Sequence, residues 1–121
     1  MPDEALAVHE SDVDGVRLLE VFGELDLATA PRLCALLDKA RMQRVRRLVV
    51  DPTGVDFCDS TGLRALMGAS TELRHAGGRL AVAVLPDGAV ARLFDVTGIR
   101  EGLRTYDTQQ DALAALAILP T

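Results

Sequence analysis

The chain has 121 residues, a net charge of −5 at pH 7, and only 3% aromatic residues. A chain with a net negative charge and few aromatic rings lacks the excess of cations that neutralises phosphates and the side chains that stack on bases, so we expect no nucleic-acid partner. The N-terminal segment MPDEALAVHE does not resemble a signal peptide, and no apolar run approaches the roughly 20 residues of a membrane span. We therefore expect one domain over residues 1–121, located in the cytoplasm and without membrane contact.

The first predicted elements are a β-hairpin and a helix. Apolar-rich segments at 5–10 and 16–23 indicate two strands, and the polar stretch between them contains an Asp-Gly pair that favours a tight turn. From Pro31 onward, apolar residues recur every three or four positions, which is helical spacing. Thr29 is placed to cap this helix, and the proline falls in its first turn, where a missing N–H costs nothing.

A strand and a second helix follow. The segment RRLVVDP at 46–52 is a compact β-rich run, and Pro52 is expected to end it. Helical spacing resumes at Leu63 and continues to the glycine pair at 77–78, which is typical of a helix end. The residues DFCDSTG at 56–62 are therefore expected in the connection between this strand and this helix.

The last third of the chain continues the alternation. The nearly continuous apolar run at 79–85 is typical of a strand covered on both faces. Asp87 is placed to cap a third helix that ends near Gly98. A short strand at 103–108 leads into a closing helix at 108–119, which begins with a Thr-x-x-Asp variant of the capping box.

The predicted order of elements is β-β-α-β-α-β-α-β-α. Strands that alternate with helices imply right-handed crossovers onto a largely parallel sheet. We therefore predict an α/β fold with a mixed, mostly parallel sheet of about five strands, an N-terminal antiparallel pair and about four helices.

The sequence has none of the common catalytic or cofactor-binding motifs. It contains neither a glycine-rich phosphate loop nor a Gly-x-Ser-x-Gly elbow, and His9 and His75 alone give a catalytic triad or a metal site little material. Cys34 and Cys58 lie far apart without a Cys-x-x-Cys spacing, so we expect two reduced, half-buried thiols. We predict no enzymatic activity, no metal and no cofactor.

Two groups of charged residues stand out. The basic run KARMQRVRR at 39–47 is interpreted as cations that complement the end of the first helix, in preference to a partner-binding patch. Glu24 and Asp26 follow the second strand, in the loop that enters that helix. Because neighbouring parallel strands end at the same edge of a sheet, we expect this loop to lie beside residues 56–62 and to form one acidic surface with them.

Ser60 and Thr61 stand where the second helix begins, and two interpretations are open. A hydroxyl at this position commonly accepts hydrogen bonds from the unpaired N–H groups of the first helical turn. The same N–H groups and the positive helix end also favour a phosphorylated serine, although the neighbouring Asp59 would repel the phosphate.

Four segments match the signature of a known family in order and spacing. They are GELDLATAPRL (23–33), LVVDPTGVDFCDSTGLRAL (48–66), the glycine pair (77–78) and RLFDVTGI (92–99). In these segments the chain resembles the STAS domain family, specifically the small single-domain anti-sigma factor antagonists of bacteria. The resemblance covers nearly the whole chain and implies the STAS fold.

The resemblance also implies a partner switch controlled by phosphorylation. In such a switch the unphosphorylated antagonist binds an anti-sigma factor that is also a GHKL-type serine kinase, and a sigma factor is released for transcription. The kinase phosphorylates the first hydroxyl of the motif, which is Ser60 here, and a PPM-type phosphatase removes the phosphate. Thr61 is the second candidate acceptor, and Asp26 matches an acid thought to help the kinase engage.

We expect the partner to bind around this motif. The residues implied are Glu24, Asp26, Asp59, Ser60, Thr61, Gly62 and Arg64. Some members of the family carry a second glycine where this chain has Arg64, whose long cation could pair with a phosphate or tune the choice of kinase.

Two other functions are compatible with the sequence. Crevices at the strand ends of an open α/β sheet suit a sensor of small molecules or nucleotides, although a phosphate-cradling loop is missing. A passive scaffold module would bind its partner whatever the state of Ser60. The sequence is compatible with a monomer or a weak dimer.

Overall fold

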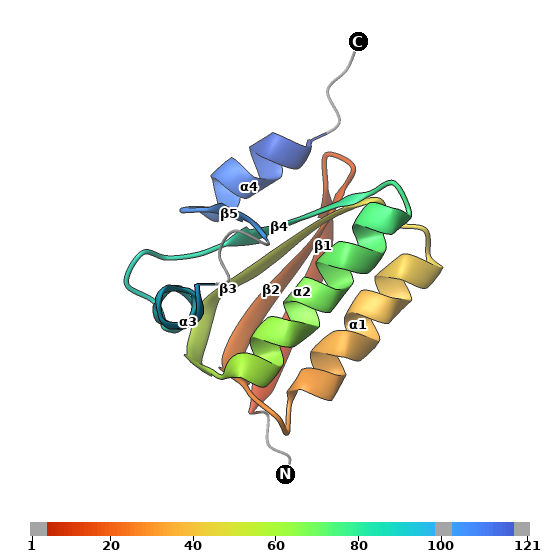
Figure 1. The fold of residues 1–121 in the computed structure, drawn as a ribbon. Coiled ribbons are helices and arrows are strands. Elements are labelled where there is room, and N and C mark those ends of the chain that lie inside the picture. The colour runs from red at the N-terminus through yellow and green to blue at the C-terminus, as the bar shows by residue number, and fades with distance from the viewer. Residues whose placement is uncertain (1–4, 99–102, 118–121) are drawn as a thin grey trace.

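The computed structural model describes residues 5–98 and 103–117, which form five strands and four helices in the predicted order (Figure 1). The strands are β1 (Leu6–Val13), β2 (Val16–Leu25), β3 (Arg47–Cys58), β4 (Arg79–Ala83) and β5 (Arg104–Tyr106). The helices are α1 (Ala30–Met42), α2 (Ser60–His75), α3 (Ala89–Thr97) and α4 (Gln109–Leu116).

The strands form one sheet in the order β1-β2-β3-β4-β5. β1 and β2 are antiparallel, and each later neighbour is parallel, which confirms the predicted mixed α/β fold. The hairpin turns at Asp14 and Gly15, whose φ angles of 52° and 81° suit the tight turn that an Asp-Gly pair favours. β1 runs three residues beyond the predicted end at residue 10, because its pairing with β2 continues to Val13.

Helices cover both faces of the sheet. α1, α2 and α3 bury their apolar sides on one face, where the larger core cluster includes Leu33, Leu66 and Phe94. α4 packs on the other face, where Ala112 and Leu116 meet residues of β2, β3 and β4. α1 and α2 lie side by side and run in the same direction, so both begin at one end of the molecule and both end at the other (Figure 1).

The prediction that Pro52 ends the third strand is wrong. β3 continues to Cys58, and its pairing with β2 shifts register between the pairs Glu20–Asp51 and Phe22–Gly54. The irregularity accommodates the proline, which has no N–H to donate, and the Asp51 carboxylate accepts a hydrogen bond from the backbone N–H of Thr53 at 2.9 Å. The strand therefore carries the chain almost to Ser60.

The predicted end of α3 and the predicted N-cap of α4 are confirmed, but the predicted N-cap of α3 is wrong. α3 ends at Gly98, which has a φ of 70°, and the hydroxyl of Thr108 caps α4 by accepting a hydrogen bond from the N–H of Asp111 at 3.0 Å. Gly88, in place of Asp87, stands at the N-cap of α3 and provides no side-chain bond. Residues 118 and 119 of the predicted closing helix lie outside the described residues.

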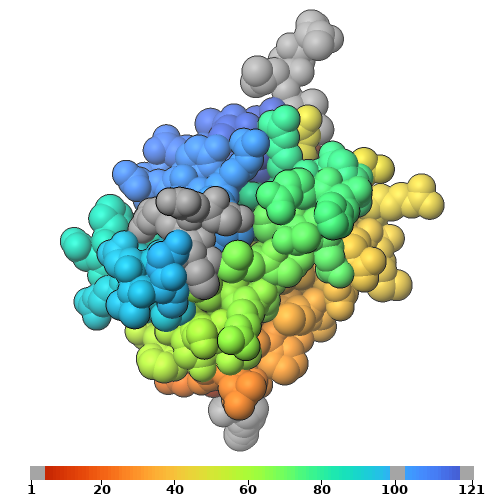
Figure 2. Space-filling view, viewed as in Figure 1, coloured from red at the N-terminus to blue at the C-terminus, as the bar shows by residue number. Residues whose placement is uncertain are grey.

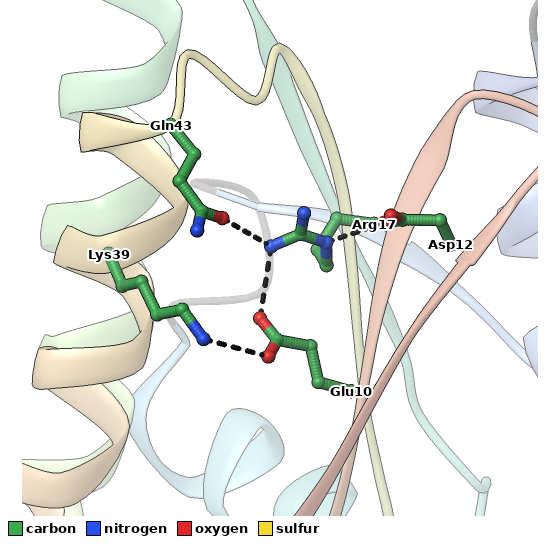
Figure 3. Close-up of polar contacts among 5 residues, drawn as sticks. All are labelled: Glu10, Asp12, Arg17, Lys39 and Gln43. Carbon is green, nitrogen blue, oxygen red and sulfur yellow. Dashed lines mark hydrogen bonds and ion pairs between the residues drawn. The ribbon is translucent and has the colours of Figure 1, made fainter.

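A polar network joins the hairpin to the end of α1 (Figure 3). The guanidinium of Arg17 donates hydrogen bonds to Asp12 at 2.5 Å, Glu10 at 2.9 Å and Gln43 at 3.0 Å, and Lys39 reaches the other oxygen of Glu10 at 3.2 Å. The bond to Asp12 and the nearby charges raise the pKa of Arg17. Part of the basic run thus has acidic partners on the hairpin.

Candidate functional site

The loops that precede α1 and α2 lie side by side, as predicted. Parallel pairing places Leu25 beside Cys58, and the N–H of Asp59 donates to the carbonyl of Leu25 at 3.1 Å. In Figure 2 the start of α2, in yellow-green, adjoins the loop before α1, in orange. We call this part of the molecule, where β2 and β3 end and α1 and α2 begin, the Ser60 end.

Asp59 caps α2. Its carboxylate accepts hydrogen bonds from the N–H groups of Thr61 at 2.9 Å and Gly62 at 3.3 Å. The interpretation that a hydroxyl of Ser60 or Thr61 caps the helix is therefore wrong. Ser60 is the first helical residue, is exposed, and makes no side-chain hydrogen bond with any described residue. Its hydroxyl is left accessible at the positive end of a helix.

Gly62 lets α2 begin close to β2. A methyl group on Gly62 would stand 2.5 Å from Cγ of Leu25 and 3.1 Å from its carbonyl oxygen, and Leu25 is fully buried. Only a residue without a side chain fits this contact. Gly62 is buried against Leu25 in the first turn of α2, two residues after Ser60. We therefore attribute the position of Ser60 to this close contact.

Asp26 organises the loop before α1. Its Oδ1 accepts hydrogen bonds from the N–H groups of Ala28 at 3.0 Å and Thr29 at 3.1 Å. Thr29 stands at the N-cap of α1 but makes no capping bond, contrary to the prediction. Its hydroxyl accepts instead from the N–H of Asp26 at 2.9 Å and donates to the carbonyl of Glu24 at 2.8 Å. The loop therefore holds its shape through its own side chains.

Glu24 was predicted to lie in this loop, but it lies within β2. It is in register with Phe57, while the next pair, Leu25 and Cys58, faces the core. Side chains alternate along a strand, so Glu24 and Phe57 lie on the opposite face of the sheet from α1 and α2. Glu24 thus belongs to the Ser60 end but to its other side.

Two exposed apolar residues at this end were missed by the sequence reasoning. Leu27, at the tip of the Asp26 loop, has 74% of its surface exposed, and Phe57 has 52%. Leu27 stands in a loop outside any helical or strand spacing, and that position is the signal that could have indicated a contact residue.

Arg64 lies one turn after Ser60 on α2. Residues four apart on a helix are neighbours on its surface, so the guanidinium can reach a group attached to Ser60. Arg64 is exposed and forms no ion pair with any described residue. It lines an open groove of about 530 Å³ between α1 and α2, together with Cys34 and Gly68. A methyl group on Gly68 would meet nothing within 4 Å.

The two cysteines differ, although both were predicted to be half-buried. Cys34 is exposed and Cys58 is buried. Burial, with a smaller contribution from the Asp59 carboxylate, raises the pKa of the Cys58 thiol to about 11. Among the described residues, no group of three or more His, Cys, Asp and Glu side chains could hold a metal ion.

The fold and the site define a small α/β domain that presents an accessible serine at the start of a helix, where two carboxylate-containing loops lie side by side. The chain belongs to the STAS domain family, whose model matches residues 9–112. None of the helices in the described segments is long and apolar enough to cross a membrane.

Named relatives cover most of the chain. It is 33% identical over 97 residues to an anti-sigma-B factor antagonist of Listeria monocytogenes. These aligned residues cover 80% of this chain and 83% of the relative. It is 29% identical over 114 residues to the anti-sigma-F factor antagonist RsfB of Mycobacterium tuberculosis, covering 93% and 91% of the two chains. The crystal structure of an anti-sigma factor antagonist from Mycobacterium paratuberculosis superposes with a TM-score of 0.84 at 30% identity, over 95% of this chain and 97% of that one.

Proposed function

We propose that this protein is a cytoplasmic anti-sigma factor antagonist, a regulator and not an enzyme, whose binding to an anti-sigma factor is controlled at Ser60. The names of its relatives support the class of partner. The observation that supports the control is the cap of α2: because Asp59 satisfies the helix N–H groups, the Ser60 hydroxyl has no structural task and stays accessible. The proposal treats residues 1–121 as one STAS domain.

The unphosphorylated protein binds the anti-sigma factor and so releases a sigma factor. The anti-sigma factor is in addition a GHKL-type serine kinase, which transfers phosphate from ATP to Ser60, and a PPM-type phosphatase reverses the modification. Thr61 is half-buried, which makes it a poorer acceptor than the exposed Ser60. No change of fold is needed, because the modification adds nearly two negative charges at the place where the partner docks.

The contact surface consists of exposed and half-buried residues around Ser60. Asp26, Leu27 and Arg64 surround the acceptor with acidic, apolar and basic groups, and Asp59 and Thr61 flank it in sequence. Glu24 contributes from the opposite face of the sheet, and Gly62 acts through the position of α2. Such a surface suits a partner that offers cations and an apolar pocket for Leu27.

A phosphate on Ser60 opposes this complex through its charge. The dianion stands beside the Asp59 carboxylate and must be desolvated when the partner covers it. Arg64 offsets part of this repulsion in the free protein, which favours the phosphorylated protein remaining free. A loss of roughly 3 kcal/mol in binding free energy weakens the complex more than about a hundredfold, enough to release the partner.

Binding of Ser60 variants to the cognate anti-sigma factor tests the proposal. Ser60→Ala should bind like the native protein and take up no phosphate from kinase and ATP, whereas Ser60→Glu should bind about a hundredfold more weakly by calorimetry. Thr71→Glu, which adds the same charge to an exposed position three turns along α2, is the matched control and should bind normally. Phosphate located elsewhere by mass spectrometry, or equal binding by the two glutamate variants, would overturn the switch.

A further inference from the structure

One face of the sheet is only partly covered by helices. α1, α2 and α3 pack on the opposite face. On this face α4 covers the first halves of β2 and β3, where its Leu116 shares a small core cluster with Val16 and Val49. The halves of β2 and β3 that run on to the Ser60 end have no helix over them among the described residues.

Strand alternation assigns the residues of this uncovered half. Side chains alternate between the two faces, and Val21, Leu25 and Cys58 belong to the core beneath α1 and α2. Their neighbours in sequence therefore face the α4 side, in agreement with the hydrogen bond of 3.0 Å from Gln109 of α4 to Glu20. Together with the residues that pair with them in register, they form what we call the open sheet face. Its residues are Ala7, His9, Glu20, Phe22, Glu24, Gly54 and Phe57.

Two phenylalanines form the apolar part of the open sheet face. The chain has three phenylalanines, of which Phe94 is buried in the core, whereas Phe22 is 45% and Phe57 52% exposed. The ring of Phe22 lies over the backbone of Gly54, because a methyl group there would collide with Cδ1 and stand 3.0 Å from Cε1 of the ring. Both rings therefore lie over neighbouring parts of β3 and expose one apolar strip.

Negative charge flanks this strip. Glu20 and Glu24 stand on either side of Phe22 along β2, and none of the residues of the open sheet face is a lysine or an arginine. Glu24 is exposed and forms no ion pair with any described residue. Glu20 is half-buried, lies 3.3 Å from Nδ1 of His9, and is in register with the buried carboxylate of Asp51. The open sheet face is thus apolar along its middle and acidic at its sides.

We propose that the open sheet face docks a cationic amphipathic helix of a partner protein. Largely parallel sheets are normally covered by helices on both faces, as α4 covers the other half of this face. A strip formed by two rings matches the apolar stripe of one helix, and lysines or arginines beside that stripe would reach Glu20 and Glu24. A second copy of this chain fits less well, because a symmetric contact would bring the same glutamates together.

This docking goes beyond the proposed function and does not rest on it. Ser60 begins α2, which packs on the opposite face of the sheet, whereas Phe22 and Phe57 face the α4 side. Glu24 is common to the open sheet face and the proposed contact surface around Ser60, so the two phenylalanines are the residues that separate the two. A helix on the open sheet face should bind whatever the charge at position 60.

Calorimetry with a synthetic helix tests the docking. The probe is an amphipathic peptide of about 18 residues, with leucines along one stripe and lysines elsewhere. The native protein should bind one peptide saturably, and Phe22→Thr and Phe57→Thr should each weaken binding about tenfold, because each removes a ring from the contact. Val96→Ser, which removes exposed apolar surface from α3 on the opposite face, should bind like the native protein.

Two further variants separate packing from charge. Gly54→Ala keeps both phenylalanines but displaces the ring of Phe22, so it should also weaken binding, with urea denaturation to show that the variant is folded. Glu24→Gln should weaken binding about threefold, whereas Glu72→Gln, which removes the same charge from an exposed position on α2, should have no effect. Equal losses in the two glutamine variants would mean a general attraction of the peptide to an acidic protein and would contradict the docking.

Other results would also overturn the proposal. A scrambled peptide of the same composition should bind weakly, since it has no apolar stripe, and equal binding would contradict a helix. Absence of saturable binding to the native protein, or an affinity lost in Ser60→Glu, would contradict a separate docking face. In sedimentation equilibrium the native protein should be a monomer, and a dimer that Phe57→Thr dissociates would assign the open sheet face to a second copy.

Discussion

Gly62 and Gly68 stand on the same helix, and the structure predicts opposite effects when each is replaced by alanine. In Gly62→Ala the new methyl group would stand 2.5 Å from Cγ and 2.9 Å from Cδ2 of Leu25. Leu25 is fully buried and cannot swing away, so overpacking costs about 1–3 kcal/mol and exceeds the gain in helix propensity of at most ~1 kcal/mol. The net expectation is a loss of about 1–2 kcal/mol.

Gly68→Ala is the matched control. Its methyl group meets nothing within 4 Å, so the variant keeps the propensity gain and should be more stable by about 0.5–1 kcal/mol. Urea denaturation followed by circular dichroism measures both changes in the free energy of unfolding. For a chain of this size 1 kcal/mol corresponds to about 4 °C in Tm, which places the two variants roughly 6–12 °C apart. The packing argument is refuted if Gly62→Ala is as stable as Gly68→Ala.

Two further predictions concern the Ser60 end. Asp59→Ala should lower the free energy of unfolding by about 1 kcal/mol, because it removes the cap of α2. Asp59→Asn should retain the cap and stay within ~0.5 kcal/mol of the native protein in the same denaturation assay. Similar losses in both variants would show that the charge of Asp59, not its capping, stabilises the protein. At pH 8 iodoacetamide should modify Cys34 and spare Cys58 until the protein is unfolded, because a thiol with a pKa of about 11 is only ~0.1% ionised at that pH. Peptide mass spectrometry assigns the label, and prompt modification of Cys58 in the folded protein would contradict its burial.

The order of elements could be predicted from the sequence because each element carries its own local signal. The Asp-Gly turn, the helical spacing after Pro31 and the glycine at 98 are all properties of neighbouring residues. Pro52 shows the limit of such reasoning. Its effect depended on a shift in pairing with β2, which is a tertiary property, and the strand continued past it.

The candidate site was predictable in position but not in detail. The motif indicated Ser60, yet three neighbouring residues, Asp59, Ser60 and Thr61, were all suitable caps by type, and only the geometry assigns that task to Asp59. A cavity of about 220 Å³ between α2, β4 and β5 was beyond local patterns, because only the folded sheet brings these three segments together.

The extension of β3 has a consequence for how readily the Ser60 end opens. Up to Val50, β3 is hydrogen-bonded to β4 as well as to β2, but from there to Cys58 β2 is its only paired strand among the described residues. A strand that is hydrogen-bonded on one side only exchanges its amide protons through smaller local openings, with a lower opening free energy, than a strand in the middle of a sheet. The stretch just before Ser60 should therefore be among the first parts of β3 to loosen. If Ser60 is the acceptor, as proposed, this loosening gives a kinase access to the serine while the remainder of the domain stays folded.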